Sequence, residues 1–297
     1  MRGRYVMKKA KGISILLTFM LLVTVITGCT SGTAGTGTAS PDSTTTADST
    51  DASGSDTTAE DTKELDGQHL VIAINATFAP FESVKEVKNG EEVLEGLDID
   101  LIEALSEKLG FTYEFDDMAF SGLIGALTSG RADVVISGIS ATEERKESVD
   151  FTRSYFTPLC AILCKEDAVY EHLSDLSGKT VAVSFGTTFQ TLAEGIQGAN
   201  VSAVDSTAVA FQEMQAGRAD ACLFDNNQAQ TFAEENDGYV AVTLSADEAA
   251  QDPYAIACPK DSELTAVLDQ ALSELEEDGT INDLVVKWLG EEYLSGN

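Results

Sequence analysis

The chain has 297 residues, and its 18 Lys and Arg against 50 Asp and Glu give a formal charge of −32 at pH 7. This acidic balance argues against nucleic acid or an anionic membrane surface as a partner, because both would repel the protein. With two histidines, His69 and His172, and no CxxC pair, the sequence predicts neither a metal site nor a cofactor.

The first segment, MRGRYVMKKAKG, carries five cations and no acid, and the apolar run ISILLTFMLLVTVITGC follows it. This pattern is typical of a secretory signal. The ending Ile26-Thr27-Gly28-Cys29 resembles the lipobox of bacterial lipoproteins, which implies cleavage before Cys29 and a diacylglycerol on its thiol. The alternative is a transmembrane helix, which the polar stretch after Cys29 disfavours. We therefore expect residues 1–28 to be a lipoprotein signal peptide and Cys29 to anchor the chain on the extracellular face of a Gram-positive-type cell membrane.

The next segment is rich in Ser, Thr, Gly, Ala and Asp, and large apolar residues are absent until Leu65. Such a composition cannot bury enough apolar surface to offset the entropy of ordering. Residues 29–66 are therefore predicted to be the lipidated cysteine and a disordered tether. About 230 residues remain, enough for a two-lobed globule.

Two pairs of similar segments indicate two related halves, namely LTSGRADVVISG (127–138) with MQAGRADACLFD (214–225) and VIAINATF (71–78) with VAVSFGTTF (181–189). Gly130 and Gly217 fit the left-handed position that ends a helix. Each half is predicted to form strand, helix, strand, the alternation that builds a parallel sheet. Chance repetition of a common unit is the alternative.

Ligands of open α/β sheets bind beyond the carboxyl ends of the strands. The predicted ends lie at Asn75, Gly138, Ser184 to Thr188, and Asp225. If the two lobes face each other, these four points converge on one cleft.

Four further cysteines lie in apolar, strand-like stretches: Cys160, Cys164, Cys222 and Cys258. We expect them to be buried small hydrophobic residues. The first two lie four residues apart on a predicted strand, roughly 13 Å between α-carbons, which is too far for a disulfide. Other pairings stay open.

Seven blocks of the chain resemble, in order, the amino-acid-binding proteins of bacterial ABC importers (solute-binding protein family 3): NATFAPFE, GLDIDLIEAL, SGISATEER, VDFTRSYF, VAVSFGTT, YAIACPK and EDGTINDLVVKWLG. The resemblance runs from about Leu65 to Leu289. It implies a two-lobed type II periplasmic-binding-protein fold, in which each lobe is a mostly parallel sheet flanked by helices and two hinge strands cross between the lobes.

The resemblance also implies domain boundaries. Lobe I would comprise residues 67–157 and 260–297, and lobe II with the hinge strands would comprise residues 158–259. Six apolar residues recur at helical spacing before Asp278-Gly279 and predict a lobe I helix: Leu264, Val267, Leu268, Ala271, Leu272 and Leu275.

An amino acid carries a carboxylate, an ammonium and a side chain. Arg145 offers a planar guanidinium for the carboxylate, and Thr142 is the expected N-cap that places Arg145 in a first helical turn. The resemblance adds the Ser140 amide and Thr188 from the other lobe. The alternative for Arg145 is a surface ion pair with a neighbouring glutamate.

For the ammonium, the matching family positions are Asp225, the Ser140 hydroxyl and the Gly138 carbonyl. A carboxylate at the end of a buried strand is costly unless a cation reaches it. Capping of the following turn is the alternative role of Asp225.

Phe78 and Phe120 match aromatic residues that enclose the ligand side chain in relatives, and core packing is their alternative. Asn75 stands where relatives that select lysine, arginine or glutamine commonly have an acid, and Ser184 stands where some relatives have a lysine. Since an amide carries no charge, we expect a neutral polar ligand.

Several other charged residues are predicted to be structural. Asp98, Asp100 and Glu103 are favourable at a helix start and need no ligand role. Arg131 and Arg218, in the repeated motif, are expected to form ion pairs.

The resemblance implies the monomeric substrate-binding component of an ABC importer, which hands a free amino acid to a membrane permease with its ATPase. The chain is not expected to be an enzyme, because no Ser-His-Asp set or acid pair is evident in the cleft. The alternatives are an enzyme of the same fold, similar to cyclohexadienyl dehydratase, and a ligand-sensing domain.

Overall fold

The computed structural model of this protein describes residues 63–88 and 90–296. The predicted signal peptide, Cys29 and nearly all of the predicted tether lie outside the described residues. None of the helices within the described ranges is long and apolar enough to cross a lipid bilayer.

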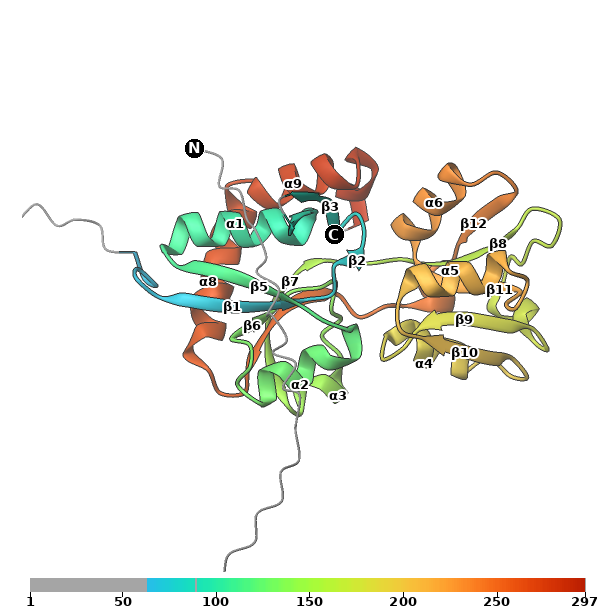
Figure 1. Cartoon of the computed structure of the whole chain (residues 1–297), viewed down its shortest axis with the longest axis horizontal. Coiled ribbons are helices and arrows are strands. Elements are labelled where there is room, and N and C mark those ends of the chain that lie inside the picture. Colours follow the sequence, from blue (N-terminus) through green and yellow to red (C-terminus); the bar gives the residue numbers. More distant parts are fainter. Residues whose placement is uncertain (1–62, 89, 297) are drawn as a thin grey trace, which may run out of the picture. The chain divides into compact units, whose positions relative to one another are not determined.

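Two five-stranded sheets form the centre of the fold (Figure 1). The order of the first is β5 (Thr112–Asp117), β1 (His69–Ile74), β6 (Val134–Val135), β13 (Tyr254–Pro259) and β7 (Val149–Phe156). The order of the second is β10 (Asn200–Val204), β9 (Thr180–Ser184), β11 (Ala221–Asp225), β8 (Cys160–Lys165) and β12 (Tyr239–Thr243). In both sheets, the first three strands are parallel to one another. The fourth strand is antiparallel to both of its neighbours, the third and the fifth.

The matching strand order confirms the two-lobed α/β fold. The similar segments of the sequence occupy equivalent places, because β1 and β9 are second in their sheets and β6 and β11 are third. Gly130 and Gly217, which follow the helices before β6 and β11, have φ of 72° and 73°, as predicted for helix ends.

Helices cover both faces of each sheet. In the first lobe, α1 (Leu97–Leu109), α8 (Glu263–Glu277) and α9 (Thr280–Trp288) cover one face and α2 (Leu123–Thr128) covers the other (Figure 1). The second lobe has α4 (Thr188–Glu194) on one face, with α5 (Thr207–Gln215) and α6 (Asn226–Glu235) on the other. Alternate strand residues enter alternate cores, as the two-residue period of a strand requires: Ile72 and Ala73 lie in different clusters.

The other elements within the described residues are a small sheet, two short helices and three 3₁₀ turns. A small third sheet consists of β2 (Thr77–Phe78), β3 (Glu82–Lys88) and β4 (Glu91–Glu95), and two short helices are α3 (Glu143–Lys146) and α7 (Ala246–Ala249). Three 3₁₀ turns are η1 (Phe120–Gly122), η2 (Leu173–Leu176) and η3 (Glu291–Gly296).

Several local predictions are confirmed. Helix α8 contains the predicted apolar stripe and is followed by Gly279 at φ 86°. The four cysteines are buried free thiols, and burial raises the pKa of Cys258 to about 12. Arg131 pairs with Asp116 at 2.9 Å and Arg218 with Glu213 at 2.8 Å.

The chain passes from the first sheet to the second after β7 and returns along β13. These two connections lie beside each other, since Phe156 at the end of β7 is the register partner of Tyr254 at the start of β13. The carboxyl ends of β1, β6, β9 and β11 lead directly to the residues of the candidate site.

Candidate functional site

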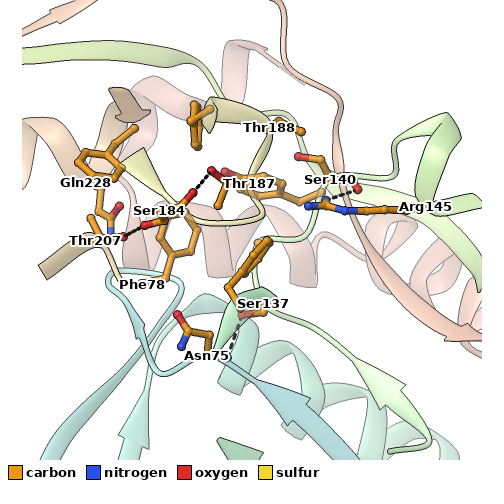
Figure 2. Close-up of a pocket in the computed structure, with 15 residues that line it drawn as sticks. Asn75, Phe78, Ser137, Ser140, Arg145, Ser184, Thr187, Thr188, Thr207 and Gln228 are labelled. Atoms are coloured by element: carbon orange, nitrogen blue, oxygen red, sulfur yellow. Dashed lines mark hydrogen bonds between the residues drawn. The ribbon is translucent and has the colours of Figure 1, made fainter. Parts of the chain in front are cut away.

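One pocket lies between the two lobes and is lined by fifteen described residues (Figure 2): Asn75, Phe78, Phe120, Ser137, Gly138, Ser140, Arg145, Ser184, Thr187, Thr188, Phe189, Thr207, Phe224, Gln228 and Tyr254. Eight of the nine predicted ligand-binding residues are among them; the exception is Asp225. Arg145 is the single charged side chain in this described lining. The pocket wall otherwise consists of aromatic rings, hydroxyls, amides and backbone.

Arg145 lies at one end of the pocket and at the start of α3 (Figure 2). The predicted cap is confirmed, because the Thr142 hydroxyl accepts the Arg145 backbone N–H at 3.2 Å. The guanidinium donates to the Ser140 carbonyl at 2.8 Å and, across the lobes, to the Gly186 carbonyl at 3.0 Å. It also lies 5.4 Å from the centre of the Phe120 ring.

Within the described residues, no ion pair to a carboxylate is found for Arg145. Of the neighbouring glutamates, Glu143 pairs with Lys146 at 2.8 Å, and Glu144 acts on Arg145 through its charge. Burial is the main cause that lowers the pKa of the Arg145 guanidinium. Because its hydrogen-bond acceptors are carbonyl oxygens without a net charge, the guanidinium still attracts an anion.

Gly138, just beyond β6, makes a close approach that only glycine allows. Its φ is +50°, and a β-carbon there would lie 2.4 Å from Cε1 of Phe78. The Gly138 N–H donates to Oδ2 of Asp98 at 2.8 Å. The neighbouring Ser137 hydroxyl accepts the Asn75 N–H at 3.0 Å and donates to Glu82.

Glu82 and Asp98 form a buried acidic pair behind this pocket wall, and both are 0 % exposed. Burial and the charge of Asp98 raise the pKa of Glu82 well above its usual range. Burial also raises the pKa of Asp98 to about 7, against the lowering effect of hydrogen bonds from Gly138 and Tyr155. The pair therefore holds a proton at neutral pH. From the sequence, Asp98 was predicted only to lie at a helix start, and no pattern indicated a role for Glu82.

Asp225 is 0 % exposed and lies outside the pocket lining. Its carboxylate caps α6 by accepting the Asn227 N–H at 2.8 Å, and it accepts the Tyr254 hydroxyl at 3.1 Å. The capping alternative is thus observed. Burial raises the pKa of Asp225 to about 6, while these hydrogen bonds oppose the rise. Contact between Asp225 and a ligand ammonium stays a prediction.

The two predicted aromatic residues have different surroundings. Phe78 stacks on Phe81 with ring centres 4.9 Å apart and meets Tyr254 edge-on at 6.2 Å. Phe120 lies against Arg145. Both rings pack against the core and also form part of the pocket wall.

The end of the pocket away from Arg145 carries neutral polar groups (Figure 2). Asn75 donates to the Met118 carbonyl at 2.7 Å and accepts the Thr77 hydroxyl at 2.7 Å. The hydroxyls of Ser184 and Thr207 are 3.2 Å apart. Gln228 donates to the Thr77 carbonyl at 3.5 Å.

Six lining residues were not predicted from the sequence: Ser137, Phe189, Thr207, Phe224, Gln228 and Tyr254. Thr187, which also lines the pocket, lies within the predicted strand end from Ser184 to Thr188. The rule that ligands bind beyond strand ends could have found two of the six. Thr207 follows β10. Gln228 lies in the helix that begins directly after β11.

Comparison with known proteins matches residues 70–291 to the family model "Bacterial extracellular solute-binding proteins, family 3". The chain is 35% identical to the arginine-binding extracellular protein ArtP of Bacillus subtilis over 229 residues, 75% of this chain and 87% of ArtP. It is 28% identical to the L-cystine-binding protein TcyJ of Escherichia coli over 226 residues, 75% and 83% of the two chains.

Among solved structures, an ancestral arginine-binding protein is 39% identical, with a TM-score of 0.69 over 75% of this chain and 98% of that one. It has been solved with arginine and with glutamine bound. Similar proteins with one fold therefore differ in the side chain of the amino acid they hold.

Proposed function

Because this chain belongs to the bacterial extracellular solute-binding proteins of family 3, we propose that it is the substrate-binding component of an ABC importer for a free amino acid with a neutral polar side chain. The observation that carries the proposal is the pocket lining. Its described residues supply one guanidinium and otherwise neutral groups, which suits a ligand with one carboxylate and an uncharged side chain.

The carboxylate of the amino acid binds Arg145. The two carbonyl partners of the guanidinium carry no net charge, so a carboxylate adds an opposite charge in direct contact and a bidentate geometry. The Thr188 hydroxyl, which donates to the Gln251 side-chain oxygen at 2.9 Å, supplies a donor from the second lobe when it turns from Gln251 to the carboxylate. Carboxylate binding thus uses both lobes.

The ammonium of the ligand binds the Gly138 carbonyl and the Ser140 hydroxyl. The Asp225 carboxylate, which accepts the Tyr254 hydroxyl, attracts the ammonium through its charge. The Asp225 carboxylate is buried among neutral donors. A cation nearby would offset the cost of keeping that charge out of water.

The side chain of the ligand lies between Phe78 and Phe120 and points to Asn75 and Ser184. An arginine or lysine side chain would bring a second positive charge to a pocket without a carboxylate in its described lining. Desolvating that charge without a partner is unfavourable. A neutral polar side chain avoids this cost.

Ligand binding favours the state in which both lobes hold the same molecule, because donors from each lobe reach it. That state is what a permease with its ATPase would recognise. The proposal includes a monomer held on the outer face of the cell membrane by the lipid on Cys29, after removal of residues 1–28.

Titration calorimetry of the mature chain tests the proposed class. Citrulline and arginine are a matched pair, since they differ mainly in the charge of the side chain. We expect citrulline or another neutral polar amino acid to bind more tightly than arginine. Tighter arginine binding would contradict the neutral class, and no heat from any amino acid would contradict the function. Turnover of a cyclohexadienyl acid would favour the enzyme alternative.

A further inference from the structure

Gln228 lines the pocket and has an unpaired side-chain oxygen atom. The residue is 6 % exposed, lines the pocket and lies in the first turn of α6. Its Oε1 is buried and has no hydrogen-bond partner among the described residues. A buried acceptor without a partner loses its hydrogen bonds to water and gains none in return.

The partner of the other amide atom fixes which way the side chain points. Nε2 approaches the Thr77 carbonyl at 3.5 Å. A carbonyl can only accept, so the nitrogen must face Thr77 and the oxygen must face away from it. The unpaired atom is therefore an acceptor, which only a donor group can satisfy.

The surroundings of Gln228 restrict that donor further. Figure 2 shows Gln228 at the opposite end of the pocket from Arg145, and Thr207 lines the same pocket. The Ser184 and Thr207 hydroxyls already contact each other at 3.2 Å. A ligand whose carboxylate binds Arg145 would present the end of its side chain, rather than its α-carbon groups, to Gln228.

We propose that Gln228 determines specificity by accepting an N–H from a neutral amide at the end of the ligand side chain. The substrate class is then amino acids with a side-chain carboxamide or ureido group. This inference rests on the proposed function and deepens it. An N–H donor pairs with Gln228 Oε1, and the amide oxygen can accept from whichever of the Ser184 and Thr207 hydroxyls does not donate to the other.

Glutamine and methionine test the inference, because they have similar length and only glutamine carries the amide. By calorimetry, we expect the protein to bind glutamine at least about tenfold more tightly than methionine. In Gln228→Met, this ratio should fall to within about threefold. Gln230→Met, on the same helix and outside the pocket lining, should keep the ratio of the unsubstituted chain.

Gln228→Glu is the second variant, and it replaces the amide with a carboxylate of the same shape. We expect the affinity for arginine relative to citrulline to rise at least about tenfold, since the new charge would pair with a guanidinium. Melting temperatures of all variants show whether they fold. If Gln228→Met does not fold, the measurement on Gln228→Glu still tests the inference.

The outcomes separate this inference from the proposed function. If amino acids bind but the glutamine to methionine ratio is equal in the unsubstituted chain and Gln228→Met, the role of Gln228 is wrong and the function stands. Equal binding of glutamine and methionine by the unsubstituted chain also overturns it. If no amino acid binds, both proposals are overturned.

Discussion

The two lobes share one strand order and differ in the chemistry that follows their strands. Beyond β6, the first lobe places Ser137, Gly138 and the guanidinium of Arg145. Beyond β9 and β11, the second lobe places hydroxyls and the amide of Gln228. Equivalent topology therefore fixes where a site forms, and the residues after each strand decide which ligand group each lobe can hold.

The two lobes also differ in the surroundings of their buried acidic residues. In the first lobe, Glu82 and Asp98 lie together, and the charge of Asp98 helps to raise the pKa of Glu82. In the second lobe, Asp225 receives hydrogen bonds from Asn227 and Tyr254, and its pKa rises only to about 6. One lobe thus stores a proton behind the pocket, while the other keeps a carboxylate that is ionised at neutral pH.

Arg145→Ala should produce the largest change in ligand affinity. Each charge-assisted hydrogen bond contributes about 1.5–3 kcal/mol, so loss of a bidentate contact should weaken binding at least about hundredfold. Calorimetry with the tightest-binding amino acid measures it. Arg131→Ala, which removes only the surface pair with Asp116, is the matched control and should bind normally. Unchanged affinity of Arg145→Ala would remove the proposed carboxylate site from the first lobe.

Glu82→Leu should destabilise the first lobe by about 2–4 kcal/mol, because it leaves the Asp98 carboxylate buried without its partner. Glu82→Gln should cost less than about 1 kcal/mol, since an amide can still donate to Asp98 and accept from Ser137. Urea unfolding at pH 7 measures both free energies. Equal costs for the two variants would show that hydrogen bonding at position 82 does not contribute to stability.

The same pair predicts a pH dependence of stability. The folded-state pKa of Asp98 is raised to about 7, above an unfolded value near 3.9. Its stabilising contribution is therefore complete below about pH 4 and is lost as the pH rises through about 7. In Asp98→Asn this part of the slope should disappear, because the titrating carboxyl is gone, and unfolding curves between pH 4 and 8 would reveal it. Retention of the full slope would assign it to other groups.

In the second lobe, Asp225 predicts a pH dependence of binding. With a pKa of about 6 in the free protein, the carboxylate becomes protonated as the pH falls, and an ammonium ligand favours its ionised form. Affinity should therefore fall by up to about tenfold per pH unit below pH 6. Asp225→Asn should bind more weakly at pH 7 and show a flat profile. An unchanged profile would mean that Asp225 does not interact with the ligand.

Thr188→Val should have the smallest effect. It removes one neutral hydroxyl from the second lobe and keeps the shape of the side chain, so we expect affinity to fall about three- to tenfold. Calorimetry against the same amino acid measures it. A loss as large as that of Arg145→Ala would mean that the second lobe holds the carboxylate as strongly as the first.

The sequence by itself determined the periodic and local features. The repeated segments, the glycines after α2 and α5, the stripe of α8 and the Thr142 cap are all confirmed. Each depends on residues that are near neighbours in the chain or share one element, so residue type and spacing are sufficient to predict them. The strand-end rule likewise predicted Asn75, Gly138, Ser184 and Thr188, which all line the pocket, and the family resemblance supplied Phe78, Phe120 and Ser140.

Only the tertiary structure decided which side chains meet across segments. Glu82 and Asp98 come from different elements and become a pair because β3 and α1 bury them together. Asp225 lies outside the pocket lining although its neighbour Phe224 lines it. The unpaired oxygen of Gln228 depends on Thr77, 151 residues away. Burial and hydrogen-bond partners are set by long-range packing, and a sequence pattern records neither.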